Sequence, residues 1–386
     1  MGSPDVVCLG ESMVVLRPGP AGAGRRLADV PSFDRGIGGA ESNVACALAR
    51  RGHPTRWISR VGADAFGTHL VAAVAAHGVD TTYVQHDPVR PTGVYFRTAG
   101  ERPTGGTTTS GTTTSGTTDP FHGEAAYYRA GSAASAMSPA LIPRAAAHAG
   151  RILHLTGITA ALSADCLALL RALVVRAATG SGPLLSFDVN YRAALWRNAA
   201  TGPRVLAELA RACDIVFVGE DEAEAAWGVT GGPDAIRAAL PEPAVLVVKQ
   251  GAAGATAYTR EAVISIPAPA VDVVAPVGAG DAFAAGFLSA TLRGLPLPAR
   301  LRHGHLMAAA ALTVPGDLGE PPPPALADTL AGLDPAAWGR LRLGPGWTGR
   351  PARVADPGTT GTTGTTGMTG TEDSRTEDSR TEDPRT

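Results

Sequence analysis

The chain has 386 residues, of which 44% are hydrophobic and 18% are charged, enough to bury a sizeable core. Its formal net charge of −2 leaves no basic surplus to neutralise phosphates, which argues against a nucleic-acid or anionic-membrane partner. No stretch reaches the roughly 18 uninterrupted apolar residues of a membrane span, and the N-terminus lacks the pattern of a signal peptide. The cysteines are isolated, without a C-x-x-C pair. We therefore expect a cytoplasmic protein with reduced thiols.

Apolar strand-like runs alternate with Ala- and Leu-rich segments of helical period along most of the chain. The predicted strands cover residues 6–9, 56–61, 151–155, 184–188, 215–218 and 245–249. The predicted helices cover residues 40–51, 67–77, 163–178, 203–212 and 234–240. This alternation predicts an α/β fold, a mainly parallel sheet with helices on both faces.

Two stretches interrupt this alternation, residues 13–38 and 90–130, and neither contains a convincing helix. Their short alternating segments predict a small antiparallel sheet that serves as a lid on the α/β core. The core then comprises residues 5–12, 39–89 and 131–345. Residues 104–119 are nearly all Thr, Gly and Ser, and the tail, residues 356–386, is repetitive and polar. Neither segment can bury enough apolar area to offset its ordering entropy, so we expect both to be disordered.

The strongest local signal is the segment 275–286, in which Gly278, Ala279 and Gly280 precede Asp281. Small residues let backbone N–H groups approach a ligand closely, and residues 281–292 have helical composition. The N-terminus of such a helix binds anionic phosphoryl oxygens, and Asp281 would lie beside them as a proton acceptor. An aspartate at a helix start is also a common N-cap, so a purely structural role stays open.

A second signal is the segment 38–45, in which two glycines precede a polar helix start that includes Asn43. Glycine permits close approach of a small ligand, and an asparagine side chain both donates and accepts hydrogen bonds. The segment is not a G-x-G-x-x-G fingerprint, because Glu41 stands where the third glycine would be. A plain turn followed by a helix cap remains the alternative.

Two arginines stand beside tyrosines, Arg129 after Tyr127 and Tyr128, and Arg192 after the predicted strand 184–188. Such a pair can clamp a planar carboxylate, and the second lies at a strand's carboxyl end, where open α/β sheets bind ligands. Ordinary surface ion pairs are the alternative.

The glycines of residues 249–254 would either let the backbone run close to a nucleotide's phosphates or form a hairpin turn. His303 and His305 point apart on a helix, which argues against a metal site.

Taken in this order, these segments resemble the ribokinase-like (PfkB) carbohydrate kinases over residues 5–320, without the Thr/Gly insertion. The segments 38–43 and 278–281 look like the family's two signatures. Within the family the chain is most similar to 2-keto-3-deoxygluconate kinases, through residues 93–95, 127–133, 154–158 and 188–196. The resemblance implies a three-layer α/β/α core with a small β-sheet lid. It also implies ATP-dependent phosphorylation of a sugar acid, whose carboxylate needs cationic partners.

Carried over to this sequence, the resemblance assigns a role to each matching residue. Catalysis would involve Asp281 with Gly278, Ala279 and Gly280. The sugar acid would contact Gly39, Asn43, Tyr95, Tyr127, Arg129, Arg192, Asp281 and Asp317. ATP would lie near Asn190, Gly219, Lys249, Gly251, Gly254, Gly278, Gly280 and His305, with Mg²⁺ reached through water by Glu222.

Three positions depart from the family pattern. Ala275 replaces a usual acidic residue, which puts a monovalent cation in doubt. Gly219 stands where a polar side chain is usual, and His305 replaces a usual asparagine beside adenine. The alternatives are a family member acting on a neutral sugar, such as fructose or ribose, and a non-catalytic sugar-acid-binding relative. Exposed lid strands offer an edge for pairing, so we expect a homo-oligomer formed through the lid.

Overall fold

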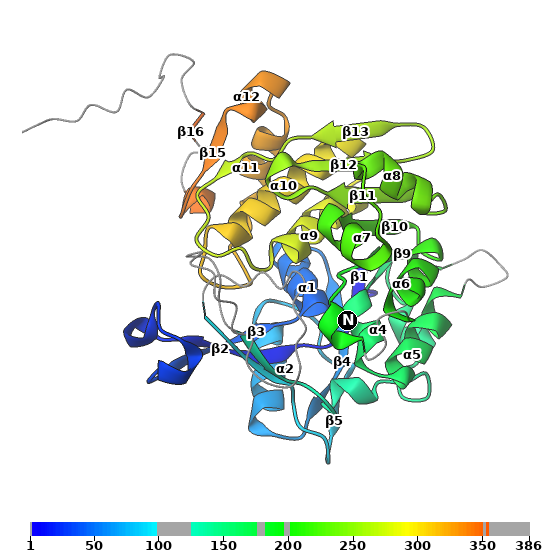
Figure 1. The fold of residues 1–386 in the computed structure, drawn as a ribbon, viewed down its shortest axis with the longest axis vertical. Coiled ribbons are helices and arrows are strands. Elements are labelled where there is room, and N and C mark those ends of the chain that lie inside the picture. Colours follow the sequence, from blue (N-terminus) through cyan, green and yellow to red (C-terminus); the bar gives the residue numbers. More distant parts are fainter. Residues whose placement is uncertain (1, 99–124, 176–181, 197–200, 350–352, 355–386) are drawn as a thin grey trace, which may run out of the picture. The chain divides into compact units, whose positions relative to one another are not determined.

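The computed structural model of the protein describes residues 2–98, 125–175, 182–196, 201–349 and 353–354 (Figure 1). The predicted disordered segments, residues 104–119 and 356–386, lie outside the described residues. Within the described ranges, no helix is long and apolar enough to cross a membrane. All four cysteines are buried and free, as expected for reduced thiols.

A nine-stranded sheet forms the centre of the fold, in the order β13-β12-β11-β10-β9-β8-β1-β4-β5. Its strands are β1 (Val6–Leu9), β4 (Thr55–Gly62), β5 (Val84–Asp87), β8 (Ile152–Thr156), β9 (Leu184–Asp188), β10 (Ile215–Gly219), β11 (Val245–Lys249), β12 (Ala255–Tyr258) and β13 (Val263–Ile266). The strands from β11 to β5 run parallel, and β12 and β13 continue the sheet in antiparallel pairing. The parallel strands are almost entirely apolar because helices cover both of their faces.

Helices pack on the two faces of this sheet and enclose two apolar cores (Figure 1). One face carries α4 (Gly157–Leu162), α5 (Ala164–Val174), α6 (Thr201–Arg211), α7 (Glu220–Trp227) and α8 (Gly232–Ala239), with the short α3 (Arg144–Ala147). The other face carries α1 (Ala40–Arg50), α2 (Ala65–Ala76), α9 (Ala279–Leu292) and α10 (Leu297–Leu312). This arrangement confirms the predicted α/β class with three layers.

A third apolar cluster covers the outer side of α10. It contains residues of α11 (Pro324–Ala331), α12 (Pro335–Gly339), β14 (Ala270–Val271) and β15 (Leu341–Leu343), and β16 (Arg353–Val354) pairs with β15. The buried Trp338 anchors this cluster, because its indole N–H donates to the Pro267 carbonyl at 2.8 Å. The sequence interpretation assigned no elements to this part of the chain.

A separate four-stranded sheet has the order β3-β2-β6-β7, built from β2 (Met13–Pro18), β3 (Phe33–Gly38), β6 (Val94–Arg97) and β7 (Ala125–Tyr128). Met13, Val15 and Tyr95 form its buried face. The sheet was predicted to be antiparallel, and this is wrong for its central pair, since β2 and β6 run parallel. The reason is topological: the chain passes through α1, β4, α2 and β5 between the two strands, a crossover long enough for parallel pairing.

Most predicted elements match the observed ones within one to three residues, and β1, β9 and β11 match at both ends. The helix predicted for residues 163–178 is too long, because α5 ends at Val174. Val175 is already extended, and the Arg144 side chain donates to the carbonyls of Ala172 and Val175. These donors satisfy the orphan carbonyls of the last turn, which favours a stop at this point.

Candidate active site

Polar side chains gather where neighbouring parallel strands of the large sheet end. Glu11 follows β1, and Thr156 and Asp188 are the last residues of β8 and β9. Gly219 and Lys249 end β10 and β11 in the same way. Because carboxyl ends of parallel strands share one edge of the sheet, these residues are brought together. Open α/β sheets bind their ligands at this edge.

The N-terminus of α9 lies beside this edge, and its shape depends on Gly278. Gly278 is the N-cap and has φ +69, in the left-handed region that favours glycine. A Cβ at this position would also collide with the Asp317 carbonyl group. No side chain caps the helix, so its first-turn N–H groups, those of Ala279 to Asp281, are the kind that bind an anion.

Asp281 lies in the first turn of α9 and is half-buried. The Asn43 side-chain amide, from the first turn of α1, donates to Asp281 Oδ2 at 2.9 Å. Burial raises the pKa of Asp281 to about 7; Asp188 and Asp317 add to the rise, whereas Asn43 and Lys249 oppose it. A carboxyl group with this pKa is suited to accepting a proton near neutral pH. The structure thus joins the two signature segments of the sequence.

An ion pair between Lys249 and Asp188 lies next to the same helix end. Lys249 Nζ donates to both Asp188 oxygens, at 2.9 and 3.0 Å, and lies 3.5 Å from where a Cβ on Gly280 would be. Burial disfavours the charged lysine, but Asp188 and Glu222 outweigh that effect and raise its pKa. Burial also raises the pKa of Glu222, whose Oε2 accepts from the Gly219 N–H at 2.8 Å. The positive charge of Lys249 is therefore held next to Gly280, in the anion-binding turn of α9.

The predicted sugar-binding residues Tyr95, Tyr127 and Asp317 form one cluster. The two tyrosine rings stack with centroids 5.2 Å apart and planes 14° from parallel. The Tyr95 hydroxyl donates to Asp317 Oδ2 at 3.2 Å. Gly39 approaches the Glu11 backbone so closely that a Cβ would collide with the Glu11 carbonyl oxygen. The small sheet and the core thus meet here through short contacts.

The two predicted carboxylate-binding arginines have separate acidic partners. Arg129, after β7, forms an ion pair with the buried Glu11, whose Oε1 also accepts from Ser132 Oγ at 2.6 Å. Arg192 is more exposed, and its Nη1 lies 3.9 Å from Glu222 Oε1. Each arginine therefore pairs with a carboxylate of the chain itself in this structure.

Sequence reasoning missed Glu11 and treated Glu41 only as a departure from a glycine fingerprint. Glu41 is fully buried, and its Oε1 accepts from Thr156 Oγ1 at 2.8 Å and from Thr159 Oγ1 at 2.7 Å. Burial raises its pKa to about 7. Gly10 allows this burial, because a Cβ there would overlap the Glu41 carboxyl group. No local pattern signals these contacts, since they join segments more than 100 residues apart.

The predicted nucleotide-binding residues differ in whether their side chains already have partners within the protein. Asn190 has φ +39, and its buried Oδ1 has no hydrogen-bond partner within the described part of the chain. Gly251 and Gly254 lie in the turn between the antiparallel strands β11 and β12, so residues 249–254 form a hairpin turn; contact of this turn with a nucleotide stays a prediction. His305 is buried against Phe283 and Trp338, and its Nε2 lies 3.1 Å from the Ile266 carbonyl oxygen. Its ring is therefore already engaged within the core.

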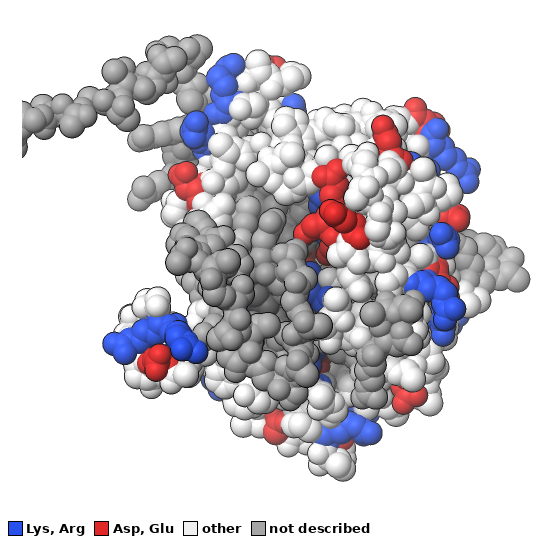
Figure 2. Space-filling view, in the orientation of Figure 1, with Lys and Arg blue, Asp and Glu red and all other residues white. Residues whose placement is uncertain are grey.

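Acidic side chains gather over α7, whose first turn contains Glu220, Asp221 and Glu222 (Figure 2). Across the described ranges, however, no three His, Cys, Asp or Glu side chains come close enough to hold a metal ion. Ala275 is buried, and it supplies no ligand oxygen from its side chain. A divalent ion at this site would thus need ligands from substrate phosphates and water, as is usual for Mg²⁺.

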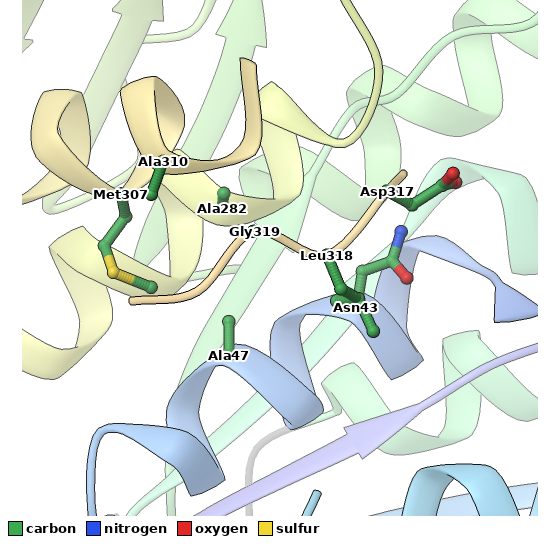
Figure 3. A pocket seen from close by; sticks show the side chains of 8 residues that line it. All are labelled: Asn43, Ala47, Ala282, Met307, Ala310, Asp317, Leu318 and Gly319. Carbon is green, nitrogen blue, oxygen red and sulfur yellow. The ribbon is translucent and has the colours of Figure 1, made fainter. Parts of the chain in front are cut away.

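A small pocket, with room for about one water molecule, lies between α1, α9 and α10. Figure 3 shows Asn43 and Asp317 at one end of this pocket and Met307 at the other. Its remaining lining residues are Ala47, Ala282, Ala310, Leu318 and Gly319. The pocket therefore adjoins the Asn43–Asp281 pair but is much too small for a sugar.

A helix N-terminus that can bind an anion, with a carboxylate beside it at the carboxyl edge of a parallel sheet, suits an α/β enzyme that transfers phosphoryl groups, because this reaction relies on positioning and charge stabilisation. Comparison with known proteins agrees, since the family model described as "pfkB family carbohydrate kinase" matches residues 3–323. The chain belongs to the pfkB family of carbohydrate kinases.

Similar proteins include a 2-dehydro-3-deoxygluconokinase of Bacillus subtilis strain 168, 34% identical over 81% of this chain and 91% of that protein. A 2-dehydro-3-deoxygluconokinase of Thermoproteus tenax is 31% identical, covering 84% of this chain and 94% of its own length. Among solved structures, a PfkB protein from Polaromonas sp. JS666 superposes with a TM-score of 0.67 at 33% identity, covering 82% of this chain and 98% of that one.

Proposed function

We propose that the protein is an ATP-dependent sugar-acid kinase that phosphorylates the terminal hydroxyl of 2-keto-3-deoxygluconate to give 2-keto-3-deoxy-6-phosphogluconate. The observation that carries the proposal is the Asn43–Asp281 hydrogen bond at the uncapped N-terminus of α9. Membership of a carbohydrate kinase family fixes the reaction class. Relatives named 2-dehydro-3-deoxygluconokinase, at 34% and 31% identity, support the substrate.

Two features of the structure fit a nucleoside triphosphate. The first is the uncapped N-terminus of α9, and the second is Asn190, whose buried Oδ1 lacks a partner among the described residues. The residues proposed to hold ATP are Asn190, Gly219, Lys249, Gly251, Gly254, Gly278, Gly280 and His305. Bound ATP would supply the phosphoryl group and Mg²⁺ would neutralise its charge, and Glu222 is the residue proposed to act on the ion through water.

The protein's own part in the reaction is to position the sugar and to accept a proton. Asp281 would take the proton of the terminal hydroxyl, while Asn43 holds the carboxylate in place through its 2.9 Å hydrogen bond. The first-turn N–H groups of α9 would stabilise the negative charge on the transferring group. Phosphoryl transfer depends mostly on positioning and charge stabilisation, so a carboxylate is a sufficient base.

On the sugar side, we assign contacts to Gly39, Asn43, Tyr95, Tyr127, Arg129, Arg192, Asp281 and Asp317. The stacked Tyr95 and Tyr127 rings would form one wall of the site. Arg129 and Arg192 would supply the cationic charge for the carboxylate. The role of the small sheet as a lid that excludes water remains a prediction, as do the cytoplasmic location and the doubtful need for a monovalent cation.

The Asp281→Asn variant tests this assignment. We expect it to lose at least about a hundredfold in kcat, because the base is removed, while ATP binding measured by calorimetry persists. An ADP-release assay with a panel of sugars and sugar acids gives the turnover. Near-normal turnover in the variant would exclude Asp281 as the base, and no turnover of any substrate by the wild type would favour a non-catalytic binding protein.

A neutral sugar is the second candidate substrate, and the Glu11–Arg129 ion pair favours it because it already compensates one of the two cations. A probable fructokinase-6 of Arabidopsis thaliana is also 31% identical over 81% of this chain. Arg129→Ala and Arg192→Ala separate the two candidates. For a sugar acid, both variants should raise KM steeply; for fructose or ribose, the change should be small. If fructose or ribose is the substrate that turns over and its KM changes little in both variants, the substrate is a neutral sugar.

A further inference from the structure

A short segment after α10, residues 315–319, is held by three side chains of the small sheet. Arg97 on β6 forms an ion pair with Asp317, and the Tyr95 hydroxyl donates to the same carboxylate at 3.2 Å. Arg17 on β2 donates from Nη1 to the Pro315 carbonyl at 3.2 Å. We call residues 315–319 the coupling segment. Its polar contacts on this side thus come from two neighbouring strands, β2 and β6.

The other side of the coupling segment packs against the catalytic end of the core. The Asp317 backbone lies against Gly278, the N-cap of α9, so closely that no Cβ fits between them. Arg50 of α1 donates to the Gly319 carbonyl at 3.1 Å, and Gly319 packs tightly on the backbone of α10. Figure 3 shows the segment running from Asp317 to Gly319 beside α1, which carries Asn43.

The Arg97–Asp317 pair is buried, with the two residues 2% and 7% exposed. Truncating one member of a buried ion pair leaves an uncompensated charge in the interior, which is strongly unfavourable. The pair therefore resists separation of the small sheet from the coupling segment. Arg97 has no place among the residues assigned to substrate or nucleotide, so its burial calls for another explanation.

We propose that Arg97 is a positioning residue for catalysis: through its ion pair with Asp317 it fixes the coupling segment against Gly278, and so links the small sheet to the anion-binding end of α9. The proposal rests on the proposed kinase function. A movement of the small sheet would be transmitted to the first turn of α9 through the coupling segment, with the buried Arg97–Asp317 pair as its ionic contact.

The pair also has an electrostatic consequence at Asp281. The groups that act on Asp281 are Asp188 after β9, Lys249 after β11, Asp317 in the coupling segment and Asn43 on α1. Asp317 contributes to the rise of the Asp281 pKa to about 7. Removing the cation of Arg97 leaves the negative charge of Asp317 uncompensated. Ionised Asp281 is then disfavoured further, and the acid limb of kcat/KM should move to higher pH.

The test compares Arg97→Met, Arg97→Lys and Arg17→Met. In Arg97→Met we expect kcat to fall at least about tenfold and the acid limb to rise by about half a pH unit or more. Arg97→Lys keeps the charge and should keep the acid limb near that of the wild type. Arg17→Met loosens the same segment without removing a partner of Asp317, so its acid limb should not move. Equal behaviour of Arg97→Met and Arg17→Met would overturn the proposal.

Two further measurements keep the proposal falsifiable. Should Arg97→Met fail to fold, Asp317→Asn replaces it, and its acid limb should move to lower pH because one carboxylate is removed; an unmoved limb counts against the proposal. Amide hydrogen exchange of Ala282, whose N–H donates to the Gly278 carbonyl at 2.9 Å, needs no activity, and it should accelerate in Arg97→Met but not in Arg97→Lys. Unchanged exchange in Arg97→Met would reject the positioning role of Arg97. A wild type without turnover would reject the kinase function but would leave the exchange result to decide the positioning role.

Discussion

Asp281 shows how tertiary surroundings can suit an ordinary helix-start aspartate to the role of base that we propose for it. Its pKa of about 7 results first from burial and then from two neighbouring carboxylates, against the opposing effects of Asn43 and Lys249. Because the base must be ionised to accept a proton, activity should be lost as the pH falls through this value. We expect kcat/KM to be half-maximal near pH 7, which a pH–rate profile measures directly. A profile that is flat from pH 5 to 8 would contradict this pKa.

Glu41 is a second buried carboxyl group, and its effect falls on stability. Its pKa rises from an ordinary 4.5 to about 7, so the native state binds its proton more tightly than the unfolded state does. Stability must therefore decrease as the pH rises from about 4.5 to 7, by roughly 3 kcal/mol from this group.

Glu41→Gln tests this linkage. Glutamine keeps an oxygen for Thr156 and Thr159 to donate to, but it carries no charge to bury. At pH 8 we expect the free energy of unfolding to rise by about 1–3 kcal/mol, and at pH 4 to change little. Urea titrations at the two pH values give both numbers. An equal change at both would show that packing, rather than charge, dominates at this position.

At the scale of elements, the entry into α9 depends on a glycine at position 278. Gly278→Ala should cost roughly 1–2 kcal/mol for the left-handed backbone. It should also lower kcat, since the new methyl group would displace either Asp317 or the first turn of α9.

Gly294→Ala, just beyond the other end of α9, is the matched control. Its φ is +70, but no atom lies within 4 Å of the added Cβ. We expect a similar loss of stability in thermal unfolding with unchanged kcat. Equal kinetic losses in the two variants would show that the contact between Gly278 and Asp317 does not position the catalytic turn.

At the scale of the whole molecule, the expected homo-oligomer through the lid remains a prediction. Among the described strands of the small sheet, β7 lies at an edge and carries Tyr128, which is 67% exposed. We expect the wild type to sediment as a dimer and Tyr128→Glu as a monomer, because a charge on an apolar contact opposes association. Val89→Glu, which alters an exposed residue after β5, should leave the wild-type value unchanged. A monomeric wild type would reject the expectation.

The α/β class was predictable because strands such as β9 and β11 are continuous apolar runs bounded by turn residues. The parallel pairing of β2 with β6 was not, because strand direction depends on the path of the chain between them. Likewise, α5 stops at Val174 through contacts of Arg144, which comes from another part of the sequence.

The sequence by itself determined the fold class, the two glycine-rich segments and the residue types of a kinase site, since these depend on local spacing. Only the tertiary structure decided how those residues are paired: Asn43 with Asp281, Arg129 with Glu11, and Arg97 with Asp317. The physical reason is that hydrogen bonds, burial and pKa shifts depend on distances across space. Partners such as Asn43 and Asp281 are separated by 238 positions in the chain.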